Sequence, residues 1–248
     1  MKNRNILLIG FLFCTLRLFA QTEYTVNLYD AQRERIVPIA IYEPKHVNKH
    51  TPVIIFNHGY GQNAPDSYIS YSCLTKPLAM KGYYVISIQH ELPNDLPLAM
   101  SGNFMKTRMP NWERGVENIL FTIKEFKKFK PKLSWNNITI MGHSNGGDMA
   151  MLFAAKHPTM AQKIISLDHR RMVMPRCSSP KVYTLRGSDY GADENVIPTV
   201  EEQQKYHISV IQLDDIKHGD MDNKGKREQH DTILYLSLIH ISEPTRPR

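Results

Sequence analysis

Cysteine, tryptophan and long apolar runs are scarce in this chain of 248 residues, which has three cysteines and two tryptophans. Cys14 falls within the first 20 residues, so only Cys73 and Cys177 remain, too few for a small disulfide-stapled scaffold. The apolar stretch near the N-terminus, residues 6–16, is shorter than the roughly 20 residues of a membrane-spanning helix. We expect two free cysteines, although export would permit a bridge, and no stable membrane insertion.

Two further absences exclude classes of ligand. The formal net charge is +7, and it falls to +3 once residues 1–20 and 237–248 are set aside. Lysines and arginines do not cluster among aromatic residues, so nothing indicates nucleic-acid binding. The histidines lack metal-ligand spacing such as H-E-x-x-H. We therefore expect no metal site, no cofactor and a small-molecule substrate.

The two ends of the chain differ from its middle. Lys2 and Arg4 precede the apolar stretch, and Leu18-Phe19-Ala20 resembles a cleavage site, so residues 1–20 are expected to be a secretory signal. Residues 237–248 (SLIHISEPTRPR) resemble a translated sequencing adapter, or else a disordered tail. We expect a secreted or periplasmic protein with one domain over residues 21–236, whose last helix ends near residue 235.

Between these ends, strand and helix patterns alternate. Residues 24–29 and 36–42 resemble an antiparallel pair. Further strands are expected at residues 53–56, 84–88, 138–141, 164–167, 181–185 and 208–213, and helices at residues 71–80, 112–129, 144–156, 200–206 and 226–235. This alternation predicts an α/β fold with a mostly parallel sheet of about eight strands and helices on both faces.

The sequence Gly-His-Ser-Asn-Gly-Gly at residues 142–147 lies between an expected strand and an expected helix. A G-x-S-x-G turn there holds its serine in a strained backbone conformation above the sheet. Side chains at Gly142 and Gly146 would collide with neighbouring backbone. The pattern indicates Ser144 as a nucleophile, although the motif alone also arises by chance in about one chain in ten of this length.

The order of the other motifs strengthens this interpretation. Asn57-His58-Gly59-Tyr60-Gly61 follows an early buried strand, whereas acidic residues and His218 follow later strands. The chain resembles the α/β-hydrolase superfamily over about residues 22–235, and most closely small bacterial esterases of the dienelactone hydrolase and platelet-activating-factor acetylhydrolase type. The resemblance implies the α/β-hydrolase fold, and the short connection at residues 169–179 leaves no room for a large lid.

A serine nucleophile needs a base and an acid. Of the eleven histidines, His218 alone follows the last expected strand and precedes a glycine. Asp189 is the first choice for the acid that orients this histidine, because it follows closely after a strand. Asp193, which resembles the D-x-x-V-x-P pattern of related hydrolases, is the alternative. Asp168, at the end of the preceding strand, is the third candidate.

The remaining site residues are expected in two loops. The backbone N–H groups of Tyr60 and Asn145 are candidates for the oxyanion hole. The long loop at residues 91–110 is expected to form part of the substrate pocket, with Phe104 and Met105 as apolar lining, or else to pack on the core.

Three functions compete at this point. The first is hydrolysis of carboxylic esters through an acyl-enzyme on Ser144. The second is a serine peptidase or amidase, in which Arg170, Arg171 and Glu91 recognise charged peptide ends. The third is a non-catalytic binding protein on the same fold.

Overall fold

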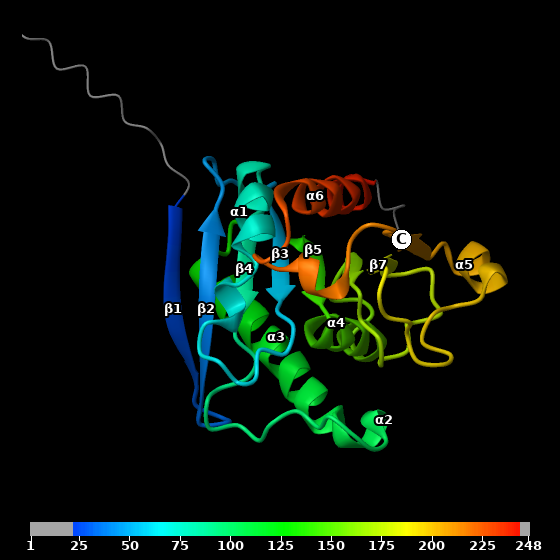
Figure 1. The fold of residues 1–248 in the computed structure, drawn as a ribbon. Coiled ribbons are helices and arrows are strands. Elements are labelled where there is room, and N and C mark those ends of the chain that lie inside the picture. Colours follow the sequence, from blue (N-terminus) through cyan, green and yellow to red (C-terminus); the bar gives the residue numbers. More distant parts are fainter. Residues whose placement is uncertain (1–21, 244–248) are drawn as a thin grey trace, which may run out of the picture.

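The computed structural model describes residues 22–243 and contains one mixed sheet (Figure 1). Its strand order is β1-β2-β4-β3-β5-β6-β7-β8. Strands β1 and β2 pair antiparallel, as do β2 and β4, and all other neighbours are parallel. The strands are β1 (Thr22–Asp30), β2 (Arg35–Glu43), β3 (Pro52–Asn57), β4 (Tyr84–Ile88), β5 (Ser134–His143), β6 (Lys163–Leu167), β7 (Lys181–Arg186) and β8 (Ser209–Gln212). The expected eight-stranded, mostly parallel sheet is confirmed.

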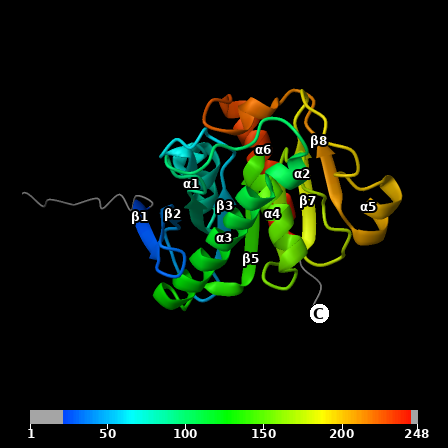
Figure 2. The same cartoon turned by 90° about the horizontal axis from the view of Figure 1, so that it is seen from below.

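Helices cover both faces of this sheet (Figure 2). The α-helices are α1 (Ser72–Met80), α2 (Phe104–Thr107), α3 (Met109–Phe129), α4 (Asn145–Lys156), α5 (Val200–Tyr206) and α6 (Arg227–Ser242), and the short 3-10 helices are η1 (Ser67–Ile69) and η2 (His218–Met221). Helices α3 and α4 pack on one face, and α1 and α6 pack on the other. Successive residues of β3 alternate between these two cores: Ile55 joins the first, and Ile54 and Phe56 join the second.

Helix α6 is longer than the sequence predicts. Ile233, Ser237 and Ile241 recur every fourth residue and are all buried, so they form one face of a continuous helix. The hydroxyl of Tyr183 in β7 also donates to the Glu243 carboxylate at 2.8 Å. The last helix therefore ends at Ser242 and not near residue 235 as expected, because a serine at the middle position of the buried face obscured the apolar period.

The connections that leave the carboxyl edge of the sheet differ in length. The segment at residues 168–180, between β6 and β7, contains no helix, in agreement with the expected lack of a lid. The longer segment after β4 contains α2, which was not predicted and whose first turn is capped by the Asn103 side chain. Among the helices of residues 22–243, none has the length and apolar character to cross a bilayer. Cys73 and Cys177 are free thiols.

Candidate active site

Ser144 occupies the sharp turn between β5 and α4. Its backbone has φ 53° and ψ −119°, a region that residues with a side chain rarely adopt. A Cβ on Gly142 would lie 2.3 Å from the carbonyl oxygen of Gly146, and one on Gly146 would lie 2.2 Å from that of Asn57. The two glycines therefore let three backbone segments approach closely enough to hold Ser144 in this conformation.

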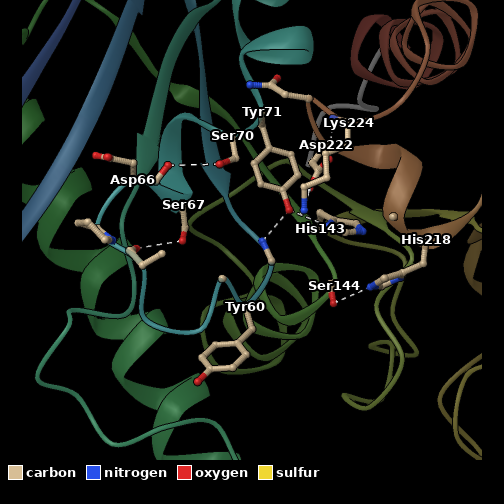
Figure 3. Close-up of a pocket in the computed structure, with 16 residues that line it drawn as sticks. Tyr60, Asp66, Ser67, Ser70, Tyr71, His143, Ser144, His218, Asp222 and Lys224 are labelled. Atoms are coloured by element: carbon tan, nitrogen blue, oxygen red, sulfur yellow. Dashed lines mark hydrogen bonds and ion pairs between the residues drawn. The ribbon is translucent and has the colours of Figure 1, made fainter.

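Three side chains from different strand ends meet at this turn. The Ser144 Oγ lies 3.0 Å from Nε2 of His218, which begins η2 after β8 (Figure 3). The Nδ1 of His218 lies 2.6 Å from Oδ2 of Asp168. The serine, imidazole and carboxylate thus form a continuous hydrogen-bonded series in which the carboxylate fixes the ring and the ring faces the hydroxyl.

Sheet register explains why Asp168 reaches the histidine. Residue 143 pairs with residue 167 across β5 and β6, so Ser144 and Asp168 leave adjacent strands at the same level. The Ser144 N–H donates to the Leu167 carbonyl at 2.9 Å. Asp168 then takes a left-handed backbone conformation with φ 50°.

The surroundings of Asp168 favour its charged form. The carboxylate is fully buried, and Oδ1 accepts from the Gly187 N–H at 3.0 Å and pairs with the Arg186 guanidinium at 2.9 Å. Burial alone would raise the pKa of Asp168, but the hydrogen bond from His218, the charge of Arg186 and the Gly187 N–H together lower it. The charge that faces the imidazole is therefore retained at neutral pH.

The first choice for the acid, Asp189, is corrected by this geometry. Its Oδ1 accepts from the backbone N–H of His218 at 2.7 Å and does not bind the ring. Asp193, the alternative, forms an ion pair with Arg171. By residue 189 the chain has left β7, whereas Asp168 directly follows β6. Asp189 holds the histidine loop, and Asp168 holds the imidazole.

The loop after β3 passes directly beside the serine. A Cβ on Gly59 would lie 3.3 Å from the Ser144 Cβ. His58 is buried, and its Nε2 accepts from the His90 N–H at 3.0 Å. Tyr60 accepts at its hydroxyl from the Leu98 N–H at 3.1 Å.

Asn145, the first residue of α4, is held by a buried polar network that the sequence did not reveal. Its Oδ1 accepts from Trp112 Nε1 at 2.8 Å, and its Nδ2 donates to the Glu91 carboxylate at 3.1 Å and to Asn111 Oδ1 at 2.9 Å. The first N–H of a helix has no acceptor within the helix. Because these hydrogen bonds fix the Asn145 side chain in the protein interior, its backbone N–H next to Ser144 is available as a donor. A carboxylate three residues after a fully buried strand, as Glu91 is after β4, was the available signal.

A cavity of about 490 Å³ opens beside Ser144 and His218 (Figure 3). Its wall combines the glycine-rich loop after β3, the residues just before α1 and the segment after His218. Much of the lining is polar, contributed by Asp66, Ser67, Ser70, Tyr71, Asp222, Asn223 and Lys224. This size is suited to one small-molecule substrate.

Phe104 and Met105 do not line this cavity. The Phe104 ring lies between two guanidinium groups, 4.4 Å from Arg108 and 4.5 Å from Arg171. Met105 is exposed. The expected apolar lining is therefore corrected, because α2 carries both side chains away from the cavity. The segment at residues 91–110 reaches the site instead through Glu91 and through the Leu98 N–H.

The strand order, the turn at Ser144 and the Ser144–His218–Asp168 arrangement define an α/β-hydrolase. Within this class, the family model named BD-FAE matches residues 39–172, more than half of the chain. The chain belongs to the BD-FAE family.

Curated relatives match over shorter stretches. A "Serine hydrolase-like protein" of Mus musculus is 26% identical over 103 residues, 42% of this chain and 32% of that protein. A "Probable serine hydrolase" of Drosophila melanogaster is 43% identical over 37 residues, 15% of this chain and 11% of that protein. The chain thus spans about a third or less of the length of these relatives.

Solved structures share the fold over nearly the whole chain. Thermogutta terrifontis esterase 2, phosphorylated by paraoxon, has a TM-score of 0.66 at 12% identity and covers 91% of this chain and 96% of its own. A putative dienelactone hydrolase from Klebsiella pneumoniae has a TM-score of 0.65 at 13% identity and covers 90% of this chain and 100% of its own. At these identities the likeness concerns the fold.

Proposed function

We propose that this protein is a serine hydrolase that cleaves carboxylic esters through an acyl-enzyme on Ser144. The observation that carries the proposal is the series Ser144 Oγ, His218 and Asp168, joined at 3.0 Å and 2.6 Å. Each atom has the partner that its role in acyl transfer requires.

In this mechanism His218 takes the proton of Ser144 as its oxygen attacks the ester carbonyl. The imidazolium that forms is stabilised by the Asp168 carboxylate. The backbone N–H groups of Tyr60 and Asn145 stabilise the oxyanion, and His218 then protonates the departing alkoxide. Water, activated by the same imidazole, releases the acid and restores Ser144.

The surroundings favour esters over peptides. Glu91, a candidate for recognition of a peptide amine, is buried and binds Asn111 and Asn145. Arg171, a candidate for a peptide carboxylate, is already paired with Asp193. These two groups are therefore engaged within the protein, and the cavity of about 490 Å³ suits a small ester.

The test uses a series of 4-nitrophenyl esters from two to twelve carbons, with aminoacyl 4-nitroanilides in parallel. The wild type should prefer short acyl chains and cleave esters faster than anilides. Ser144→Ala should lower kcat by about a million-fold while the protein stays folded. A fluorophosphonate should label the wild type and not the variant. Unchanged ester turnover in Ser144→Ala would refute the proposal, and faster anilide cleavage would replace it with an amidase.

We also propose that residues 1–20 direct export and are removed. The charged start, the short apolar stretch and the Leu18-Phe19-Ala20 site support this proposal. Expression of the full chain in a bacterial host, followed by N-terminal sequencing of the exported protein, should give Gln21 first. Protein retained in the cytoplasm with Met1 intact would contradict it.

A further inference from the structure

Tyr71 is buried beside the proposed active site and has no role in the mechanism above. It directly precedes α1 and is only 4% exposed. Its ring packs against Phe56 of β3, with ring centroids 5.0 Å apart. Its hydroxyl lies 3.0 Å from the backbone nitrogen of Gly59 and 2.7 Å from Nδ1 of His143 (Figure 3). One hydroxyl therefore touches both the loop after β3 and the residue before the nucleophile.

The direction of these two hydrogen bonds follows from proton counting. The Gly59 N–H can only donate, so the Tyr71 oxygen accepts from it. The hydroxyl proton then needs an acceptor, because a buried donor without one costs free energy. Nδ1 of His143 is the other contact of this hydroxyl, so Tyr71 donates to it. A neutral His143 that accepts at Nδ1 must carry its own proton on Nε2.

The state of His143 matters because its ring lies against His218. The two ring centroids are 4.5 Å apart with an interplanar angle of 43°. Burial, followed by the influence of His218, lowers the pKa of His143 to about 3. His143 therefore stays neutral while His218 takes up the serine proton. A second positive charge at this distance would oppose that step.

Tyr71 is itself fixed by the segment that carries His218. Asn223 Oδ1 accepts from the Cys73 N–H at 2.9 Å and so supplies a cap for the first turn of α1. The Asn223 N–H donates to the Ser70 carbonyl at 2.8 Å. The start of α1, the loop after β3 and the histidine segment thus meet around one tyrosine.

We infer that Tyr71 is a positioning residue: its hydroxyl holds Gly59 of the oxyanion loop and fixes His143 as the neutral Nε2–H tautomer that packs against His218. The inference rests on the proposed ester hydrolysis, since Gly59 acts through Tyr60, and His143 acts through His218, in that reaction. Removing the hydroxyl leaves the Gly59 N–H without its acceptor and frees the His143 tautomer, while the Tyr71 ring stays in the cavity wall.

The experiment compares Tyr71→Phe with Tyr68→Phe, both measured with 4-nitrophenyl butyrate. Tyr68 is also a buried residue but does not line the cavity, so its variant controls for loss of a tyrosine hydroxyl elsewhere in the protein. We expect Tyr71→Phe to lower kcat about 10- to 100-fold, less than the 10²- to 10³-fold typical of removing an oxyanion donor itself. KM should change by less than about threefold, because the hydroxyl is bonded to Gly59 and His143 and the ring still lines the cavity. Tyr68→Phe should stay within about twofold of the wild type.

Nitrogen NMR of histidine-labelled protein supplies a readout independent of turnover. In the wild type, His143 should show a protonated Nε2 and an unprotonated, hydrogen-bonded Nδ1. In Tyr71→Phe the Nδ1 signal should move toward that of a free nitrogen, and the Gly59 amide should exchange faster with solvent. Tyr68→Phe should leave both signals unchanged.

The outcomes separate this inference from the proposed function. Ser144-dependent hydrolysis with an unchanged kcat in folded Tyr71→Phe would overturn the inference and leave the function standing. A His143 protonated at Nδ1 in the wild type would overturn it even if Tyr71→Phe failed to fold. No Ser144-dependent hydrolysis in the wild type would overturn both.

Discussion

The active site joins two regions that are built differently. The nucleophile region consists of β5, the turn at Ser144 and the first turn of α4, and its residues from 138 to 154 are almost entirely buried. The loop region consists of the segments after β6, β7 and β8, which supply Asp168, Asp189 and His218. In the first region, backbone packing fixes one serine. In the second, hydrogen bonds select among several polar residues.

This difference determines what a local pattern can encode. A side chain at Gly142 or Gly146 would collide with the backbone of the turn or of the end of β3. The nucleophile can therefore be predicted from six consecutive residues. The acid depends on which of two loops, after β6 or after β7, presents a carboxylate to His218. That choice is set by strand register and by donors such as Arg186 and Gly187, which lie elsewhere in the sequence.

The largest predicted effect is on turnover, and it distinguishes Asp168 from Asp189. Asp168→Asn removes the charge that faces the imidazole and should lower kcat by about 10⁴-fold, as in other Ser-His-Asp sites. Asp189→Asn keeps a carbonyl oxygen that can accept from the His218 N–H, so kcat should fall less than about tenfold, since only one hydrogen bond becomes weaker. Initial rates with 4-nitrophenyl butyrate measure both.

Circular dichroism must first show that both variants are folded at the assay temperature, because Asp168→Asn leaves the buried Arg186 without its carboxylate. A larger loss of kcat in Asp189→Asn than in Asp168→Asn would mean that the histidine loop rearranges in solution. It would also restore the original choice of acid.

Much of the fold could be predicted from the sequence, because β3, β4, β6 and β7 are buried strands that are rich in apolar residues. Ser144 could be predicted because the steric demands of its turn require glycines close by in the sequence. His218 could be predicted because it follows the last strand. Phe104 was misplaced because four residues of helix α2 turn it between two arginines. The anchoring of Asn145 by Glu91 was missed because the two residues are 54 positions apart.

A second prediction concerns stability and compares one glycine from each region. In Gly146→Ala the new Cβ would lie 2.2 Å and 2.4 Å from the carbonyl oxygens of Asn57 and His58. Backbone must move, so the free energy of unfolding should fall by more than about 3 kcal/mol. In Gly191→Ala, in the loop after β7, no atom lies within 4 Å of the new Cβ, and the change should stay within about 0.5 kcal/mol.

Urea unfolding followed by circular dichroism measures both glycine variants. Equal destabilisation by the two alanines would contradict the contrast between a tightly packed nucleophile region and an open loop. A stable Gly146→Ala protein that retained turnover would show that the turn at Ser144 can relax.

The smallest predicted effect tests the contact that joins the regions. Asp148, in the first turn of α4, accepts at Oδ1 from the backbone N–H groups of Arg171 and Met172 at 2.9 Å and 2.8 Å. Burial raises the pKa of Asp148 to about 6, although these hydrogen bonds oppose the shift. Asp148→Asn keeps the acceptor and removes the charge.

The sign of the pH dependence follows from linkage. Because the folded state holds the Asp148 proton more tightly than the unfolded chain does, Asp148 contributes stability below its ordinary pKa of 3.8, and this contribution is lost as the pH rises through about 6. The unfolding free energy of the wild type, relative to Asp148→Asn, should therefore fall by up to roughly 3 kcal/mol between pH 4 and pH 7. Urea titrations across this range measure the difference. Asp193→Asn, which alters an exposed carboxylate in the segment after β7, should run parallel to the wild type. Parallel curves for Asp148→Asn as well would mean that water reaches this carboxylate and that the two regions are joined less tightly than their hydrogen bonds indicate.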